Sequence, residues 1–349
     1  MQRRISKKIK VGNIFIGGDA PVTVQSMLNV PSTDIEGSVK QAAELEKAGC
    51  EIIRAAVPDM AAVKLISRLK ENLTVPVVAD IHFDHRLALE SLEAGVDKIR
   101  INPGNIGSMD KVRLVARKCK NKGVPIRIGV NGGSLEKEIL AKYSSPSAEA
   151  LCESAMGHVK ILEQCDFDDI VISIKSSDVE TMIKAYRLVA GQCGYPLHLG
   201  VTEAGTYNSA LIKSSIGIGS LLCDGIGDTI RVSMTAQPLS EVYAGIEILK
   251  AAGIRTDCPS IVSCPTCGRT RIDLIALANG VEERLKSVKK GIKVAVMGCV
   301  VNGPGEAREA DIGIAGGDGC AVIFKKGEIL RKVDEKNALD SLMEEIEKL

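Results

Sequence analysis

Two cysteines, Cys264 and Cys267, stand in the segment SCPTCGRT and form the pattern C-x-x-C. The next cysteine along the chain is Cys299, in the segment MGCVVNGPGEA. No histidine occurs beyond position 198, which excludes a local zinc site of three cysteines and one histidine. A redox-active dithiol is the simplest alternative, but it would prefer a thioredoxin-like βαβ unit, which this region lacks. Three thiolates on turns rich in Gly and Pro suit a [4Fe–4S] cluster, whose irons take thiolate ligands.

The fourth ligand of such a cluster would come from outside these three cysteines. Glu306 lies beyond the turn NGPG and is the nearest carboxylate after Cys299. A carboxylate is a harder and more exchangeable ligand than a thiolate, so that a substrate oxygen could displace it. A site of four cysteines would need Cys258 or Cys320 instead, although neither belongs to a second C-x-x-C, as a zinc ribbon would require.

A second group of reactive side chains lies on short apolar runs in the first 234 residues. Asp80 and Glu203 are acids on two of these runs, and Asn102 and Asn131 add neutral hydrogen-bonding groups. Five runs carry a cation, and five cations that meet at one opening would bind a strongly anionic ligand, most simply one with phosphates. Structural ion pairs are the alternative, which a single arginine would favour. The five cations are Arg54, Arg100, Arg127, Lys175 and Arg231.

Eight apolar runs between positions 21 and 234 must position these cations. Helix-like segments such as SVKQAAELEKAG and DKVRLVARKCKNKG separate the runs, and several end in Gly, a common helix stop. Strands that alternate with helices predict βα units on a parallel sheet, closed here as a (β/α)8 TIM barrel. Active sites of such barrels lie at the carboxyl ends of the strands. The segment KIKVGNIFIGG predicts a hairpin that plugs the barrel floor.

The alternation of strands and helices stops after Gly253. A helix, a strand, a Gly/Pro loop, two short strands and a terminal helix predict a smaller α+β domain, with IRTDCPSIV as the connector. We expect residues 1–256 to form the TIM barrel that binds the substrate and residues 257–349 to form the C-terminal cluster domain. No G-x-G-x-x-G follows a strand in the required context, so a dinucleotide-binding fold is unsupported.

Composition limits the class of protein. Of the 349 residues, 45% are hydrophobic and 26% are charged, which is typical of a globular chain. The net charge of +1 argues against a general surface for nucleic acid or an anionic membrane. The chain has neither an apolar run long enough to span a bilayer nor a convincing signal peptide. We therefore expect a cytoplasmic protein, whose cysteines serve metals, catalysis or packing.

Several segments resemble the bacterial 4-hydroxy-3-methylbut-2-enyl diphosphate synthases: VADIHFD, RINPGNIG, LHLGVTEAG, GIGDTIRVS, CPTCGR and GCVVNGPGEA. The resemblance covers nearly the whole chain and keeps the order of the motifs. It implies an iron–sulfur oxidoreductase of the non-mevalonate isoprenoid pathway, with flavodoxin or ferredoxin as electron donor. Two electrons open the ring of 2-C-methyl-D-erythritol 2,4-cyclodiphosphate and remove a hydroxyl as water, which gives 4-hydroxy-3-methylbut-2-enyl diphosphate. One departure is Gln237, where many family members carry Asp.

The resemblance also implies roles for individual residues. The cluster ligands fall on Cys264, Cys267, Cys299 and Glu306. Glu203 lies near the reacting carbons and is the best candidate to protonate a leaving oxygen. The contacts with the diphosphate and the hydroxyls fall on Arg54, Arg100, Asn102, Arg127, Asn131, Lys175, Arg231 and Ser233.

The position of the connector suggests a homodimer. The helix after the eighth strand returns the chain near Gly253 to the face opposite the barrel mouth. From there the connector Ile254–Ser263 can reach at most ~35 Å, past strands roughly 20 Å tall and a ring of helices. A cluster domain that reaches the mouth of a partner subunit is easier, and the resemblance agrees. We therefore expect an active site shared between two subunits.

Three other classes explain part of the sequence. A radical enzyme would need its three cysteines in one tight cluster early in the chain. A structural or metal-sensing module would explain the cysteines but not the basic barrel mouth. A pterin-binding barrel with a zinc-stabilised tail would explain the barrel but not the turn before Glu306.

Overall fold

The computed structural model describes residues 2–103, 105–288, 290–299 and 307–349. The chain divides into two compact units, Met1–Ile254 and Arg255–Leu349. From the sequence, we placed this boundary between residues 256 and 257. None of the described helices is long and apolar enough to cross a membrane.

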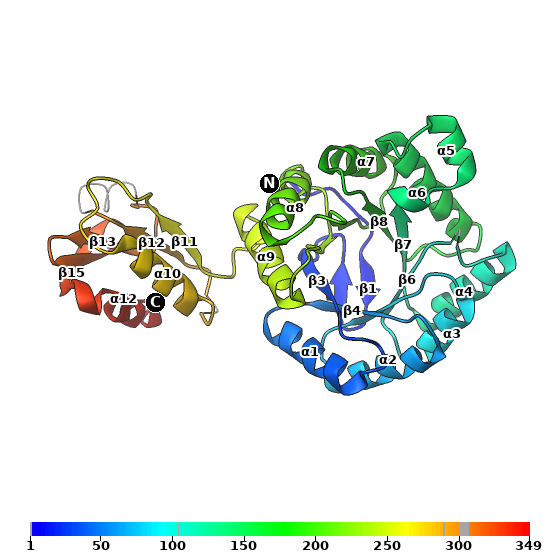
Figure 1. Ribbon diagram of the computed structural model, residues 1–349, viewed down its shortest axis with the longest axis horizontal. Helices are drawn as coiled ribbons and strands as arrows, with labels where there is room; N and C mark the ends of the chain where they lie inside the picture. The colour runs from blue at the N-terminus through cyan, green and yellow to red at the C-terminus, as the bar shows by residue number, and fades with distance from the viewer. Residues whose placement is uncertain (1, 104, 289, 300–306) are drawn as a thin grey trace. The chain divides into compact units, whose positions relative to one another are not determined.

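The described part of the first unit contains an eight-stranded parallel sheet in the order β8-β7-β6-β5-β4-β3-β10-β9. A parallel bridge between Ile172 and Leu197 joins its two edge strands, so the sheet closes into a barrel. Helices surround the strands (Figure 1), which confirms the predicted (β/α)8 fold. The strands are β3 (Thr23–Met27), β4 (Ile52–Ala56), β5 (Val77–Asp80), β6 (Lys98–Ile101), β7 (Ile126–Asn131), β8 (Ile170–Lys175), β9 (His198–Leu199) and β10 (Thr229–Ile230).

Local signals set the ends of the barrel helices. The Asp34, Asp59 and Asp178 side chains each accept a hydrogen bond from a backbone N–H in the first turn of the helix that follows. Gly123 ends its helix in the left-handed conformation, with φ 64°. The helices are α1 (Ile35–Lys47), α2 (Met60–Asn72), α3 (His85–Glu93), α4 (Met109–Lys122), α5 (Lys137–Tyr143), α6 (Ala148–Glu163), α7 (Val179–Gln192), α8 (Tyr207–Cys223) and α9 (Pro238–Ala251).

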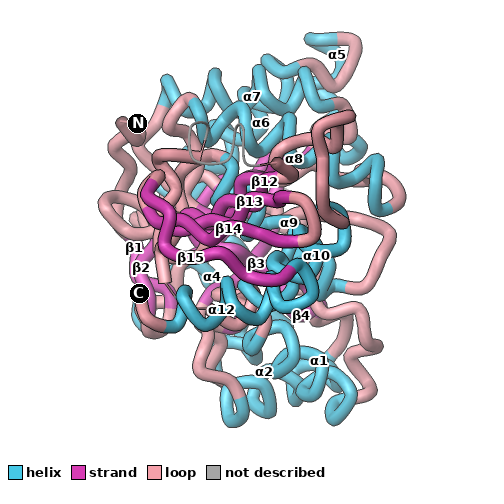
Figure 2. Tube along the Cα trace, turned by 90° about the vertical axis from the view of Figure 1, so that its left-hand side faces the viewer, coloured by secondary structure: helices cyan, strands magenta, loops and turns pink. Residues whose placement is uncertain are grey.

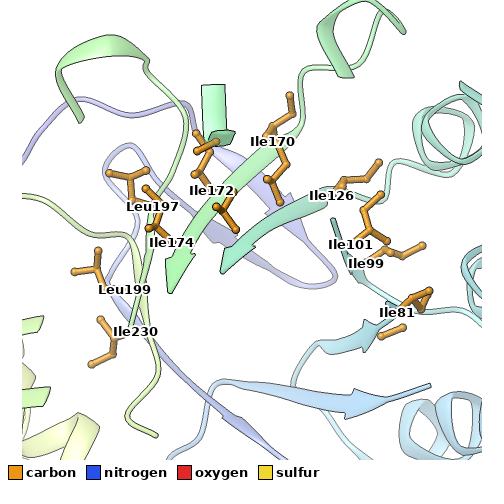
Figure 3. Packing of buried hydrophobic residues seen from close by; sticks show 14 of the residues in the cluster. Ile81, Ile99, Ile101, Ile126, Ile170, Ile172, Ile174, Leu197, Leu199 and Ile230 are labelled. Atoms are coloured by element: carbon orange, nitrogen blue, oxygen red, sulfur yellow. The ribbon is translucent and has the colours of Figure 1, made fainter. Parts of the chain in front are cut away.

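Side chains alternate between the two faces of each barrel strand. One set packs between the strands and the helices as a buried apolar layer. Figure 3 shows Ile99, Ile126 and Ile170 from this set, directed away from the centre of the barrel. The other set therefore faces the interior, and most polar residues of the strands belong to it, whereas Ser26 of β3 lies on the outward face near Glu241.

An antiparallel hairpin, β1 (Ile9–Val11) and β2 (Ile14–Ile16), closes the barrel floor as predicted. Its apolar side chains form a buried cluster with three inward residues of the barrel, Ile52, Val78 and Val171. The interior is therefore sealed at the amino ends of the strands, and a ligand can enter at the carboxyl ends.

The second unit is an α+β domain with a five-stranded mixed sheet in the order β11-β12-β13-β14-β15. Helices α10 (Leu274–Leu285) and α12 (Ala338–Glu347) pack on one face of this sheet (Figure 2). Two strands were missed by the sequence analysis: β11 lies partly in the expected connector, and β15 is an exposed edge strand. The strands are β11 (Ser260–Ser263), β12 (Lys293–Met297), β13 (Ile312–Gly317), β14 (Cys320–Lys325) and β15 (Glu328–Asp334).

Candidate active site

The inward side chains of the barrel stack in layers, each supplied by alternate strands. The strand registers set these layers, because residues paired in a parallel sheet point to the same face. The layer above the hairpin holds Ile52, Lys98, Val171 and Thr229. The next layer holds Gln25, Val78, Arg127 and His198. The third layer holds Arg54, Arg100, Ser173 and Arg231.

Two of the predicted cations share one carboxylate. Arg100 Nη1 donates a hydrogen bond to Asp80 Oδ1 at 3.1 Å, and Arg54 Nε lies 3.6 Å from Asp80 Oδ2. All three side chains are buried. Burial alone would raise the pKa of Asp80, but Arg54 and Arg100 hold it well below its usual range. Asp80 is therefore ionised and keeps both guanidinium groups in place.

A third cation, Arg231, pairs with a residue that the sequence analysis missed. Both carboxylate oxygens of Glu241, on α9, accept hydrogen bonds from Arg231 at 3.1–3.3 Å. The backbone N–H of Met234 also donates to Glu241, at 3.2 Å. No sequence motif predicts this pair, because Glu241 lies in the helix that follows Arg231 and its side chain reaches back to the arginine.

The remaining two cations face the interior without an ion pair in the described part of the chain. The three guanidinium nitrogens of Arg127 are buried and make no hydrogen bond to described residues. Burial, with Arg54 and Arg100 nearby, lowers the pKa of Arg127 well below its usual value. Burial likewise lowers the pKa of Lys175 to about 6, and the same two arginines add to the effect. Structural pairing thus explains three of the five cations, and the excess positive charge suits an anionic ligand.

Neutral groups line the same end of the barrel. Asn131 ends β7 beside Lys175, its partner in the strand register, and its Oδ1 is buried without a hydrogen-bond partner in the described structure. Asn102 is buried one residue beyond the end of β6, and Ser233 is half-buried beyond β10. Gly129 provides space for Arg100, because a Cβ at this position would lie 2.4 Å from Arg100 Nε.

Glu203 lies in the turn after β9, with an exposed side chain. Its φ of 52° is in the left-handed region, which a residue with a side chain rarely adopts. A backbone hydrogen bond from Thr235 to Gly205, at 2.9 Å, joins this turn to the segment after β10. Strained backbone that neighbours hold in place is common at functional sites. The sequence TEAG gives no signal for this strain.

The histidines occupy different environments. His82 lies at the mouth, where its Nδ1 is 3.2 Å from Arg100 Nη1. His198 is the first residue of β9, and its side chain is buried inside the barrel with its Nδ1 2.6 Å from Thr229 Oγ1. His158 is buried on α6, with its Nε2 2.7 Å from Glu136 Oε1. Of these three, His82 is therefore placed to meet a ligand at the mouth.

The long connection after β7 is ordered into the 3₁₀ helix η1 (Gly132–Ser134) and α5. Glu136, between them, anchors the connection to α6 through His158 and through a 2.8 Å hydrogen bond from Ser154 Oγ. The neighbouring His158 ring lowers the pKa of Glu136 to about 2. The segment is thus tied to the helix that follows it, next to Asn131 at the barrel mouth.

In the second unit, parallel pairing brings the cysteine-bearing turns to one edge of the sheet. Cys264 follows β11 and Cys299 follows β12, two strands that pair from Ser260 and Lys293 onward. Gly298 N–H donates to Cys264 Sγ at 3.1 Å, so the two turns are in contact. The backbone of Arg269 donates a hydrogen bond that lowers the pKa of Cys267, which favours its thiolate.

These turns fit the chemistry of an iron–sulfur site, since they present thiols beside backbone N–H donors. Among the described residues, however, no three His, Cys, Asp or Glu side chains are grouped closely enough to hold a metal ion. Glu306, the predicted fourth ligand, lies outside the described residues. The ligand set Cys264, Cys267, Cys299 and Glu306 therefore stays a prediction.

Both units match one family. The GcpE TIM-barrel domain matches residues 6–246, and the GcpE protein C-terminal domain matches residues 260–348. The chain belongs to the GcpE family. A 4-hydroxy-3-methylbut-2-en-1-yl diphosphate synthase (flavodoxin) from Clostridium acetobutylicum is 60% identical to this GcpE-family chain over 349 residues, which is 100% of both chains. The synthase of the same name from Geobacter sulfurreducens is 55% identical over 344 residues, 99% of this chain and 98% of its own. The resemblance inferred from the motifs is confirmed.

Solved structures share the barrel at low sequence identity. Dihydropteroate synthase from Stenotrophomonas maltophilia superposes with a TM-score of 0.53 at 15% identity, over 70% of this chain and 97% of its own. The N-acetylneuraminic acid synthetase from Leptospira borgpetersenii gives 0.51 at 14% identity, over 72% and 91%. At these identities the likeness shows the fold alone.

Proposed function

We propose that this GcpE-family chain is a 4-hydroxy-3-methylbut-2-enyl diphosphate synthase of the non-mevalonate isoprenoid pathway. It opens the ring of 2-C-methyl-D-erythritol 2,4-cyclodiphosphate with two electrons and releases a hydroxyl as water. The observation that carries this function is the match to synthases at 60% identity over the whole of both units. The excess of buried cations over carboxylates in the barrel supports an anionic substrate of this kind.

The barrel residues bind and orient the cyclic diphosphate. Arg127 and Lys175 have no ion pair in the described structure and are free to take the phosphate oxygens. Arg54, Arg100 and Arg231 keep their guanidinium groups oriented through Asp80 and Glu241, and their remaining N–H groups can face the substrate. The neutral groups of Asn102, Asn131 and Ser233 suit the hydroxyls of the sugar-derived portion.

Glu203 is the proposed proton donor to a leaving oxygen. Its side chain at the carboxyl end of β9 is exposed, and no ion pair ties it to another described residue. The constrained turn fixes its direction, which reduces the freedom lost when the proton is transferred.

We propose that Cys264, Cys267, Cys299 and Glu306 hold a [4Fe–4S] cluster. The contact between Cys264 and the Gly298 N–H, and the thiolate favoured at Cys267, support the cysteine ligands. When bound there, the cluster would supply the two electrons one at a time. Glu306 would be the ligand that exchanges most readily, because a carboxylate binds iron less firmly than a thiolate. A cytoplasmic setting, which keeps thiols reduced, suits these ligands.

Flavodoxin is the proposed electron donor, since it stands in the printed name of the relatives at 54–60% identity over 97–100% of this chain. Turnover with purified flavodoxin and with purified ferredoxin, compared at equal concentration, tests this choice. A rate with ferredoxin that exceeds the rate with flavodoxin would reverse it.

The homodimer with a shared active site is a further part of the proposal. Its support is the helix α9, which returns the chain to the amino ends of the strands before residue 254. An Arg127→Ala subunit has an intact cluster domain, and a Cys299→Ser subunit has an intact barrel. Mixed dimers of the two should therefore recover part of the turnover. Heterodimers that form and stay inactive would refute a shared site.

An anaerobic assay tests the function as a whole. The purified protein should be brown, and it should convert the cyclic diphosphate to the linear diphosphate alcohol in the presence of reduced flavodoxin, as seen by mass spectrometry. Arg54→Ala, Arg100→Ala or Arg231→Ala should weaken substrate binding by roughly ten- to a hundredfold and leave the cluster spectrum unchanged. A colourless protein with stoichiometric zinc and no product would favour a structural metal module instead.

A further inference from the structure

Lys98 is a buried basic side chain that the five predicted cations do not include. It points into the barrel from β6, two residues before Arg100, and its relative exposure is 0%. The registers place it in the layer nearest the floor, beside Ile52, Val171 and Thr229. The sequence carries a weak signal for it, because period-two alternation puts Lys98 on the same face as Arg100.

Among the residues that the structure describes, none places a counter-charge beside Lys98. Its Nζ makes no hydrogen bond to any described residue. The charged groups that face it are Arg127 from β7 and Arg54 from β4, both cations. His198, on β9, also lies near enough to feel its charge, and burial together with Arg127 and Lys98 lowers the pKa of that imidazole.

The nearby carboxylates are engaged with other groups. Asp80 lies above the third layer and holds Arg54 and Arg100. Asp228, at the amino end of β10, accepts hydrogen bonds from Ser6 Oγ and Leu197 N–H, both at 2.8 Å. The hairpin below contributes the apolar side chains of its buried cluster, and Lys10 on β1 is exposed to solvent.

An ammonium group buried among cations is unfavourable, and loss of its proton relieves the cost. Burial, followed by the charges of Arg127 and Arg54, lowers the pKa of Lys98 well below its usual value. Loss of the Nζ proton is therefore favoured in the free protein. An anion that docks on the cations above it reverses this balance, because charges inside the barrel are only weakly screened by salt.

We propose that Lys98 is a proton-binding site of the barrel interior, which takes up one proton when the diphosphate docks on the cations above it. This inference rests on the proposed function for the identity of the anion. The proton comes from solvent and forms one N–H bond at the Nζ lone pair, and no other bond changes. The empty barrel thereby avoids a further buried cation beside Arg54, Arg100 and Arg127, and the occupied barrel gains one. The site favours a highly charged anion over a weakly charged analogue.

Calorimetry of substrate binding measures this proton directly. The oxidised holoenzyme is titrated with the cyclic diphosphate near neutral pH without reductant, so that no turnover occurs, in buffers of different ionisation enthalpy. Lys98→Met keeps the length of the side chain and removes its charge, whereas Lys10→Met is the matched control on the exposed face of the hairpin. We expect Lys98→Met to take up about one proton fewer than wild type, and Lys10→Met to match wild type. Equal proton uptake in Lys98→Met and wild type would overturn the proposal.

A second measurement needs no ligand. Because Lys98 is neutral when folded and charged when unfolded, the unfolded chain binds more protons up to the ordinary lysine pKa, and wild-type stability gains from rising pH. The free energy of unfolding of Lys98→Met should not rise with pH in this way. The amount by which Lys98→Met is more stable than wild type should therefore be largest at low pH. Parallel pH profiles of the unfolding midpoint would show that Lys98 carries its charge in the folded barrel, against the proposal. Absence of substrate binding in wild type, with divergent profiles, would count against the proposed function alone.

Discussion

A methyl group added at Gly129 should disable Arg100 without touching either the ligand or the charge of the pocket. Gly129 lies on the inward face of β7, and a Cβ there would lie 2.4 Å from Arg100 Nε and 2.6 Å from Nη2. Arg100 is 1% exposed and is held by its hydrogen bond with Asp80. Gly129→Ala therefore forces either the guanidinium or the strand to shift.

The expected magnitude follows from these distances. An ordinary carbon contact is about 3.5 Å or longer, so the clash requires a shift of about 1 Å. Such a shift would stretch the 3.1 Å bond between Arg100 and Asp80 beyond hydrogen-bonding range. Overpacking of this kind lowers the free energy of unfolding by about 1–3 kcal/mol. Loss of one charge-assisted bond to a phosphate removes roughly 1.5–3 kcal/mol of binding free energy, or about ten- to a hundredfold in affinity.

Calorimetry with the cyclic diphosphate and thermal unfolding measure the two effects. Gly133→Ala is the matched control, since a Cβ at Gly133, in the 3₁₀ helix η1 after the same strand, would meet nothing within 4 Å. In an Arg100→Ala background the Gly129→Ala change should have little further effect, because the atoms that it displaces are absent. Wild-type affinity in Gly129→Ala, or an equal loss in both backgrounds, would refute a role of Arg100 in binding.

Three further predictions concern stability and the cluster. Gln237 is the N-cap of α9, and its side chain makes no capping hydrogen bond. Gln237→Asp should therefore raise the free energy of unfolding by about 0.5–1 kcal/mol. An unchanged urea midpoint would contradict this prediction. The pKa of Glu136 is lowered to about 2, mainly by His158, so the stabilisation is complete above the ordinary glutamate pKa and is lost as pH falls toward 2. Glu136→Gln should therefore be less stable than wild type at pH 6 and equal to it near pH 2, with faster hydrogen exchange in residues 132–143, whereas a constant difference would point to another cause. Ser in place of Cys264, Cys267 or Cys299 should abolish the iron–sulfur absorbance. Glu306→Cys should instead keep a four-iron Mössbauer spectrum with little turnover. Full activity in Glu306→Cys would point to Cys258 or Cys320 as the fourth ligand.

The sequence determined the barrel because its signals are local. Apolar runs at regular spacing and Gly residues at helix ends are each interpretable within a short window, and all eight strands lie where these signals put them. The two missed strands lack such signals. In β11 only Ile261 is partly buried, and β15 is exposed at nearly every position. Neither strand therefore shows the contrast between a buried and an exposed face on which the prediction of a strand depends.

The motifs also identified the family and the types of residue in the site. Arg54, Arg100, Arg127, Lys175 and Arg231 were recognised as cations at strand ends, and Cys264, Cys267 and Cys299 as thiols on turns. Residue type and motif order are properties of the chain itself, so they survive without any knowledge of its fold.

Only the tertiary structure decided which of these groups are partners. Asp80 lies between Arg54 and Arg100 because parallel strands adjacent in the barrel bring their inward side chains together. Glu241, in the helix α9, reaches back to Arg231, which lies just after β10. Lys98 is surrounded by cations because closure of the barrel brings β4, β6 and β7 around one interior. Such pairings depend on strand register and barrel closure, which are set by long-range packing. No short window of sequence contains that information.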